Sequence, residues 1–357
     1  MLVIDADTHV DETEDTWGYM REEEIEFKPT TAYPAKLDPS RRPSRYWLID
    51  GQRQIRFIRD DNRTRTTVET RELLDVQARL RAMDERGTQV QVIYPTLFIM
   101  ESTKRPEVSL ALRRSYNRWL ADRCAQSGGR LRWVCLPPAM TMDEAVKELR
   151  FAKDHGACGV MKKGDREAGR WPADPYFFPL YEEAERLGMP ICFHTGSGTP
   201  DFPSAKDVSL GSFMRSQLPT VHAFHTLLRH EVPSKFPKLR FGFIEANSSW
   251  IPYVTYDLSR RLKRPGGRPN NPRYTVPGDL LKANRMYVTC QVDEDLPYIL
   301  KFSGEDNLMI GSDYTHADQS MEHDFPRLLK ERADTGEIPQ SAVNKILYQN
   351  AQTLYGL

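Results

Sequence analysis

The first ten residues place two carboxylates and an imidazole at alternating positions behind a short apolar run. Val3 and Ile4 are followed by Asp5, Asp7 and His9. In an extended strand, side chains two residues apart point to the same side, so Asp7 and His9 would project together. A carboxylate and an imidazole held side by side can transfer protons or bind a metal ion.

Four later apolar runs also end in ionisable residues. These residues are Lys162 with Lys163, His194, Glu245 and Asp313. One carboxylate at a strand end is usually a helix cap or a hydrogen-bond partner, but the joint pattern indicates a shared site. A divalent cation would satisfy two carboxylates and two imidazoles at once. The predicted metal ligands are Asp7, His9, His194 and Asp313.

The apolar runs alternate with amphipathic stretches of helical period. The eight runs cover residues 2–4, 90–94, 131–136, 159–161, 190–193, 239–244, 286–289 and 308–310. A last helix is predicted over 341–354. Repeated strand–helix units predict a parallel sheet, and eight of them predict an α/β fold of the (β/α)8 TIM-barrel type. Such barrels carry their chemistry at the C-terminal ends of the strands, where the ionisable residues fall.

One segment interrupts the alternation. Residues from about 18 to 70 are polar and contain a β-hairpin pattern over 45–58 that turns at Asp50-Gly51. We interpret this segment as an insertion after the first strand that could serve as a lid. The whole chain, 1–357, is interpreted as a single barrel domain with a long loop over 260–280.

The composition excludes several classes of partner. Lysine plus arginine and aspartate plus glutamate both total 50, and the zero net charge argues against a nucleic-acid or anionic-membrane partner. No apolar run approaches the ~20 residues that span a bilayer, and no signal peptide is expected. The five cysteines form no C-x-x-C pair, which favours a reducing compartment and a cytoplasmic location.

Short motifs spread through the chain carry a family resemblance. They include IDADTH at 4–9, MDERG at 83–87, VIYP at 92–95, GSDY at 311–314 and NAQTLYGL at 350–357. In this order they resemble the amidohydrolase superfamily, specifically its amidohydrolase-2 branch. That branch holds aminocarboxymuconate-semialdehyde decarboxylase-like and γ-resorcylate decarboxylase-like enzymes, with some hydrolases and hydratases. The resemblance implies a metal-dependent barrel enzyme that acts on a small molecule and forms a homodimer.

The resemblance also implies roles for single residues. The H-x-H motif of the family corresponds to Asp7-Thr8-His9, its strand-five ligand to His194 and its strand-eight carboxylate to Asp313. Two positions depart from the pattern. Asp7 replaces the first histidine, and Glu245 stands where many decarboxylases of the branch carry a catalytic histidine.

Both one-ion and two-ion sites fit this resemblance. In the preferred one-ion site, the four predicted ligands hold the metal. In the two-ion site, Lys162 corresponds to the carbamylated lysine that bridges the ions of binuclear amidohydrolases, and Glu245 replaces a histidine ligand. The oxygen and nitrogen donors suit zinc, iron or manganese.

The first functional choice is a metal-dependent hydrolase. It would use a metal-activated water on an amide, ester, thioester or C–C bond next to a carbonyl, in a small carboxylate-bearing or cyclic substrate. The catalytic residues would be Asp313, Glu245 and His194. The alternative is non-oxidative decarboxylation of an aromatic or unsaturated acid, with Asp313 protonating the carbon. A barrel that only binds a ligand is disfavoured, because its buried charges would be costly.

Four further residues are candidates for substrate contact. His222 and His225 lie three apart on a helix predicted over 219–230, so they share a face. His316 follows Asp313 by three residues, in the predicted rim loop. Arg215 could pair with a substrate carboxylate.

Overall fold

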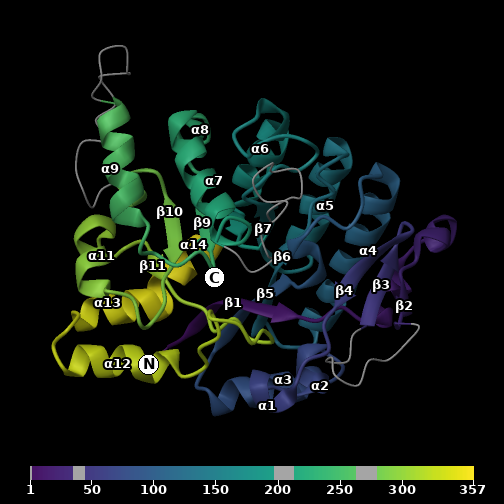
Figure 1. The fold of residues 1–357 in the computed structure, drawn as a ribbon, viewed down its shortest axis with the longest axis horizontal. Helices are drawn as coiled ribbons and strands as arrows, with labels where there is room; N and C mark the ends of the chain where they lie inside the picture. Colours follow the sequence, from purple (N-terminus) through teal and green to yellow (C-terminus); the bar gives the residue numbers. More distant parts are fainter. Residues whose placement is uncertain (1, 35–44, 197–212, 263–279) are drawn as a thin grey trace.

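The computed structural model describes residues 2–34, 45–196, 213–262 and 280–357. Its main sheet has eight parallel strands that follow one another in chain order, as the sequence predicts. The strands are β1 (Ile4–Val10), β5 (Val90–Pro95), β6 (Leu131–Cys135), β7 (Ala157–Lys163), β8 (Ile191–His194), β9 (Phe241–Ile244), β10 (Met286–Thr289) and β11 (Leu308–Met309). Figure 1 shows them at the centre of the molecule, with helices around them.

The connecting helices confirm the α/β alternation. The longer ones are α3 (Val76–Glu85), α4 (Pro106–Ala125), α5 (Met142–Asp154), α6 (Phe178–Leu187), α7 (Gln217–Arg229), α9 (Ile251–Leu262), α11 (Leu296–Ser303) and α12 (Phe325–Asp334). Local residues set their ends: Pro106 opens α4, and Gly188 ends α6 in the left-handed region at φ 67°. The predicted last helix consists of α13 (Gln340–Asn344), a π-helical turn and α14 (Asn350–Tyr355).

Backbone hydrogen bonds join the first strand to the segment that follows the last one. The Ala6 N–H donates to the Ile310 carbonyl (3.1 Å), the Asp313 N–H to the Asp7 carbonyl (3.0 Å) and the His9 N–H to the Tyr314 carbonyl (2.9 Å). Gly311 makes this approach possible, since a Cβ there would lie 2.4 Å from the Asp7 Cβ and 2.7 Å from its backbone nitrogen. We call this contact between β1 and residues 310–314 the seam; it brings the two ends of the sheet together as in a barrel.

The insertion after β1 contains the predicted hairpin. Strands β3 (Arg45–Ile49) and β4 (Gln52–Arg56) pair antiparallel, and β2 (Thr30–Ala32) joins them. Asp50 and Gly51 both have positive φ, 50° and 71°, as a two-residue hairpin turn of the I′ type requires. Residues 57–60 of the insertion reach the cavity described below. Its action as a lid stays a prediction.

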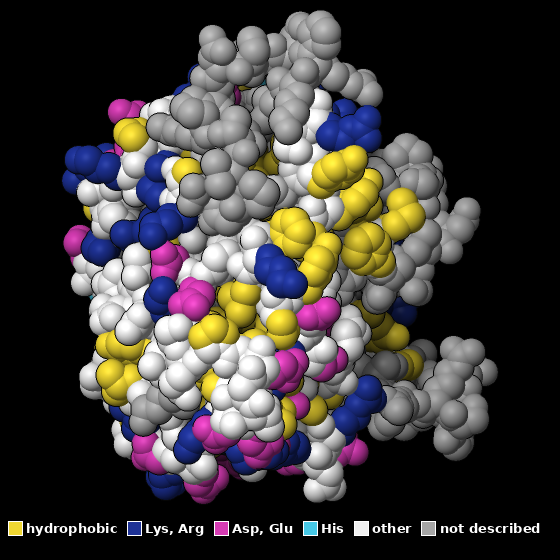
Figure 2. All heavy atoms as spheres, turned by 90° about the vertical axis from the view of Figure 1, so that its left-hand side faces the viewer, with side chains coloured by type: hydrophobic (Ala, Val, Ile, Leu, Met, Phe, Trp, Pro, Cys, Tyr) yellow, Lys and Arg dark blue, Asp and Glu magenta, His cyan; other side chains and the backbone are white. Residues whose placement is uncertain are grey.

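One face of the molecule gathers exposed hydrophobic side chains (Figure 2). Helices α9 and α11 lie on this side in Figure 1, and they carry the exposed Tyr253, Tyr256 and Tyr298. The homodimer implied by the resemblance stays a prediction. In the described part of the chain, no helix is both long enough and apolar enough to cross a membrane.

The seam predicts a steric cost at Gly311. We expect Gly311→Ala to lower the free energy of unfolding by about 1–3 kcal/mol or more, because the new methyl group meets the backbone of Asp7. Urea denaturation measures this loss. Gly18→Ala is the matched control, since a Cβ at Gly18 meets no atom within 4 Å. Equal stability of the two variants would contradict a close contact at the seam.

Candidate active site

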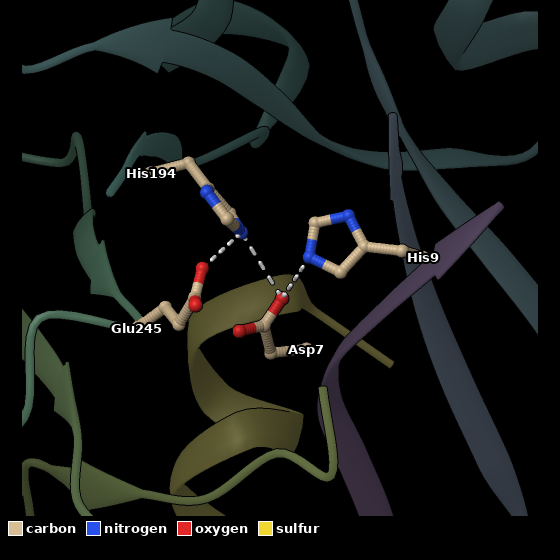
Figure 3. A group of neighbouring side chains, drawn as sticks. All are labelled: Asp7, His9, His194 and Glu245. Atoms are coloured by element: carbon tan, nitrogen blue, oxygen red, sulfur yellow. Dashed lines mark hydrogen bonds and ion pairs between the residues drawn. The ribbon is translucent and has the colours of Figure 1, made fainter. Parts of the chain in front are cut away.

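Four predicted side chains converge at the C-terminal ends of the strands. We call Asp7, His9, His194 and Glu245 the inner group (Figure 3). Asp7 Oδ1 lies 3.5 Å from His9 Nε2 and 3.3 Å from His194 Nε2, and His194 Nε2 lies 3.6 Å from Glu245 Oε2. All four side chains are buried. The carboxylates therefore face the imidazole nitrogens across a small shared space.

The backbone fixes which nitrogen of each imidazole faces that space. Nδ1 of His9 lies 2.9 Å from the Pro95 carbonyl, and Nδ1 of His194 lies 3.0 Å from the Thr195 carbonyl. Because a carbonyl oxygen only accepts, each Nδ1 carries the proton and donates it. In the neutral rings, Nε2 is left with its lone pair directed at the inner group, as in a metal-binding histidine.

A second group adjoins the first. We call Glu245, Asp313, His316 and Asp318 the outer group, and it shares Glu245 with the inner one. Asp313 Oδ1 lies 2.7 Å from His316 Nδ1 and 3.4 Å from His9 Nε2. The His316 ring stacks on the His9 ring at 3.9 Å, and its Nε2 lies 3.2 Å from Thr96 Oγ1. Sequence reasoning missed Asp318, although it follows His316 by only two residues.

Burial and charge shift the ionisation of these residues. Burial raises the pKa of Glu245 to about 8, and burial with the charge of Glu245 raises the pKa of Asp313 well above its usual range. Burial opposes charge on His194, but Asp7 and Glu245 raise its pKa to about 9. A divalent cation among these donors would replace the protons that the site otherwise holds. With the His194 proton displaced in this way, both Nε2 lone pairs join the carboxylates in a donor set that fits a divalent metal.

The backbone is strained at the same place. Glu245, Asp313 and Thr315 have positive φ values of 61°, 51° and 91°. Such conformations cost about 1–3 kcal/mol each in residues other than glycine, and they cluster at functional sites. The positive φ values of Glu245 and Asp313 thus coincide with the two groups of candidate ligands.

Asp5, the first acid of the chain, serves the seam instead of the metal group. It accepts hydrogen bonds from the Ser312 N–H (2.8 Å), the Ser312 hydroxyl (2.6 Å) and the Gln91 amide (3.2 Å). Arg79, which is fully buried, donates to the other end of Gln91 (2.7 Å) and stacks on Tyr314. This layer holds the backbone on both sides of the inner group.

The structure gives Lys162 a different partner from the one expected in the two-ion site. In the register of β7 and β8, Lys162 pairs with Phe193, whereas Lys163 pairs with His194. Lys162 therefore points away from the side that His194 faces. Its Nζ lies 2.7 Å from Glu167 Oε2 and 3.3 Å from the centre of the Phe177 ring. Lys162 is a buried ion-pair residue in the described structure.

Two of the four substrate candidates reach the cavity. A cavity of about 790 Å³ is lined by Arg215, His316, Glu245 and Asp318 together with residues of the insertion. His225 instead lies 3.2 Å from Asp257 of α9, and His222 is an exposed residue packed edge-on against Trp171. The helix face that carries both histidines is thus not brought to the cavity.

Sequence reasoning also missed an arginine of the cavity wall. Arg59 follows β4 in the insertion, and its Nε lies 3.0 and 2.9 Å from the two Asp11 oxygens. Its Nη2 is buried and has no hydrogen-bond partner among the described residues. The nearby Arg63 lines the same cavity. No spacing rule singles out Arg59 among the many arginines of the chain.

Comparison with known proteins defines the family. A family model described as amidohydrolase matches residues 4–357. The chain belongs to the amidohydrolase family. It is therefore an enzyme of the amidohydrolase superfamily, whose branch members bind a divalent metal, and the two groups offer donors for one.

Known proteins similar to this chain include decarboxylases. A γ-resorcylate decarboxylase from Rhizobium sp. (strain MTP-10005) is 24% identical over 57% of this chain and 65% of its own length. The chain spans 40–65% of the length of the curated relatives it matches. Among solved structures, an amidohydrolase from Mycobacterium avium subsp. paratuberculosis K-10 has a TM-score of 0.74 at 20% identity, covering 100% of this chain and 98% of that one.

A second solved structure contains a metal. It is a dihydroxybenzoic acid decarboxylase from Polaromonas sp. JS666 with bound manganese and 2-nitroresorcinol, with a TM-score of 0.63, 17% identity and coverage of 100% and 97%. At these identities the structural similarity establishes the fold. Together with the eight observed strands, it confirms the predicted barrel.

The Lys162–Glu167 pair generates a prediction that separates stability from metal binding. We expect Lys162→Met to lower the free energy of unfolding by about 3–5 kcal/mol, because Glu167 is left buried without its cation. Metal content per folded chain should stay at the wild-type value. His9→Gln is the control that should lose metal. If Lys162→Met is too unstable to measure, the double variant Lys162→Met/Glu167→Gln removes both charges of the pair and allows the same measurement. Loss of metal from either variant would place Lys162 among the metal ligands.

Glu12 holds the loop that carries Thr96. Its carboxylate accepts the N–H groups of Thr96 (3.1 Å) and Leu97 (2.9 Å), and burial raises its pKa to about 8. Between pH 4.5 and 8 the folded protein therefore keeps a proton that the unfolded chain has lost. Stability must fall as the pH rises through this range, by up to about 1.4 kcal/mol per pH unit from this group.

We therefore expect Glu12→Gln to flatten the pH dependence of stability. Urea denaturation at pH 5, 6, 7 and 8 would show a smaller decline for the variant than for the wild type. Glu26→Gln, at an exposed position, controls for the loss of one carboxylate. Parallel curves for Glu12→Gln and the wild type would show that Glu12 is already ionised in the folded protein.

Proposed function

We propose that the protein is a metal-dependent non-oxidative decarboxylase of an aromatic or unsaturated carboxylic acid. The observation that carries the proposal is the pairing of a metal-ligand group with a guanidinium-bearing wall around one cavity. Arg59 offers a buried, unpartnered Nη2 at that wall. Guanidinium groups bind carboxylates through charge-assisted hydrogen bonds, so an anionic substrate suits this cavity.

The rest of the wall suits a flat, partly apolar molecule. Phe57, Ile58, Ile99 and Met100 line the cavity together with its polar members. A volume of about 790 Å³ lies in the range that holds small-molecule ligands. Apolar contacts orient a ring or an unsaturated chain, while Arg59 and Arg63 select for its charge.

The inner group supplies the metal site of this proposal. Asp7, His9, His194 and the adjoining Asp313 would hold a divalent cation such as zinc, iron or manganese, with Glu245 as a further donor. When bound, such an ion supplies a Lewis acid that draws electrons from the substrate oxygens. The N–H donors to Pro95 and Thr195 keep both imidazoles in the orientation that this role needs.

Decarboxylation also needs a proton donor. When the C–C bond breaks, CO2 leaves, and the electron pair stays on carbon and takes up one proton. We assign the delivery of this proton to the Asp313–His316 pair, in which Asp313 is buried and His316 lines the cavity. Thr96 and the stacked His9 ring hold His316 in place.

The comparisons support this choice over hydrolysis. The curated relatives are described as γ-resorcylate decarboxylases, and decarboxylases occur among the similar solved structures. A metal-dependent hydrolase is the second candidate. It is favoured by Glu245, which follows β9 and places a carboxylate among the candidate metal donors, where it could take a proton from an attacking water.

Isotope incorporation separates the two reactions. We expect the manganese-loaded enzyme to release CO2 from a member of a hydroxybenzoate and unsaturated-acid panel. In D2O, the product should carry one deuterium at the carbon that bore the carboxylate. Incorporation of 18O from labelled water into the products of an ester, amide or C–C substrate, with no CO2 release from any acid, would instead support the hydrolase.

Arg59 gives a specific kinetic prediction. We expect Arg59→Gln to raise KM for the acid about 10–100-fold with a smaller change in kcat, because one charge-assisted contact to the substrate is lost. Arg53→Gln is the matched control, since Arg53 is an exposed arginine of the same insertion. An unchanged KM in Arg59→Gln would remove Arg59 from the carboxylate site.

A further inference from the structure

Two buried tyrosines lie next to the inner group, and the reaction proposed above gives them no role. Tyr94 belongs to β5 and Tyr355 ends α14. Their exposed fractions are 0% and 2%. Through Tyr355, the NAQTLYGL motif at 350–357 reaches the carbonyl of Ala6 on β1.

The Tyr94 ring packs against both imidazoles of the inner group. Its centre lies 5.0 Å from the centre of the His194 ring and 6.2 Å from that of the His9 ring. The two imidazoles are 4.9 Å apart and meet edge to face. Each is held by one hydrogen bond from Nδ1 to a carbonyl, and a single hydrogen bond does not fix the tilt of a ring. The contact with Tyr94 opposes such a tilt, because the interior of a protein is close-packed.

A directed chain of hydrogen bonds fixes the Tyr94 ring in turn. The Tyr355 hydroxyl donates its one proton to the Ala6 carbonyl (2.9 Å). The Tyr94 hydroxyl must therefore be the donor in the 2.8 Å contact between the two hydroxyls. Burial raises the pKa of both hydroxyls well above the usual range, so both protons stay in place at neutral pH. The chain ties Tyr94 to β1, the strand that carries Asp7 and His9.

We propose that Tyr94, held by Tyr355, is a positioning residue of the metal site that fixes the orientation of His9 and His194 toward the ion. The inference deepens the proposed function and rests on its metal site. Because the Tyr94 hydroxyl is engaged with Tyr355, Tyr94 acts through the two histidines and not as a ligand itself. Loss of a group that orients metal ligands commonly weakens metal binding about 10–100-fold.

Manganese titration of the full chain tests the inference without a substrate. After removal of metal with a chelator, Mn²⁺ is added and the free ion is measured by electron paramagnetic resonance. We expect Tyr94→Leu, which removes the ring, to bind Mn²⁺ about 10–100-fold more weakly than the wild type. Tyr94→Phe and Tyr355→Phe keep the rings but break the hydrogen-bond chain, so each should weaken binding about three- to tenfold.

Tyr116→Leu is the matched control. Tyr116 is also fully buried, but its ring packs against Phe98 and Trp119 and not against the imidazoles. We expect this variant to lose stability in urea as Tyr94→Leu does, while it binds Mn²⁺ at wild-type strength. Equal weakening in both leucine variants would reveal a general loss of packing and overturn the inference, as would wild-type binding in Tyr94→Leu.

The phenylalanine variants decide the question if Tyr94→Leu does not fold. Wild-type binding of Mn²⁺ in both would then overturn the inference. If Tyr94→Leu folds and binds weakly while both phenylalanine variants bind normally, the role of Tyr355 alone is overturned.

The visible spectrum of Co²⁺ in the same site gives a second readout, because it reports the geometry of the ligands. We expect the Co²⁺ bands to shift in Tyr94→Leu and to keep their wild-type positions in Tyr116→Leu. Wild-type bands in Tyr94→Leu would overturn the positioning role. A wild type that binds neither ion would overturn the metal-dependent function as well, whereas one that binds metal but releases no CO2 would overturn the decarboxylase alone.

Discussion

The candidate site depends on the seam, the close backbone contact between β1 and residues 310–314. A side chain larger than hydrogen at Gly311 would overlap Asp7, and three backbone hydrogen bonds fix the register across this contact. Because the Asp313 N–H donates to the Asp7 carbonyl, acids from opposite ends of the chain are held in adjoining positions. The same register places His9 beside His316, whose rings stack. The seam therefore places the β1 members of the inner group, Asp7 and His9, beside Asp313 and His316 of the outer group.

Buried ionisable groups would normally destabilise such a contact, because they lose their hydration. Here a layer of hydrogen bonds beside the seam stabilises it. Asp5 and Ser312 bind one another across the seam, while Arg79 and Gln91 complete the layer. From the other side, the Tyr355 hydroxyl of α14 donates to the Ala6 carbonyl (2.9 Å). The carboxylates of the inner and outer groups therefore lie on a backbone held in place by hydrogen bonds. They cannot easily move apart to reduce the repulsion between their charges.

Most of the fold and most residues of the inner and outer groups could be predicted from the sequence, for a physical reason. Apolar runs that end in acids or histidines identify strand ends, and parallel strands end at the same rim of a barrel. These two rules were enough to predict that Asp7, His9, His194, Glu245 and Asp313 lie close together. The direction of a side chain was harder to predict, because neighbouring residues of a strand point to opposite faces of the sheet. Lys163 pairs with His194, whereas Lys162, one residue earlier, points to the other face. Arg59 and Asp318 lie in loops, where only the folded backbone determines what a side chain reaches.

The position of the arginines connects the insertion to the chemistry. Barrel strands supply the inner group, but Arg59 and Arg63 come from the insertion after β1, and Asp11 on the rim holds Arg59 by its Nε. A guanidinium fixed in this way leaves Nη2 for a substrate while its own charge is partly balanced. The metal-donor residues and the arginine-bearing wall of the cavity thus belong to separate parts of the chain. Under the proposed function, changes in the insertion would alter which acid is selected without disturbing the residues that the seam holds in place.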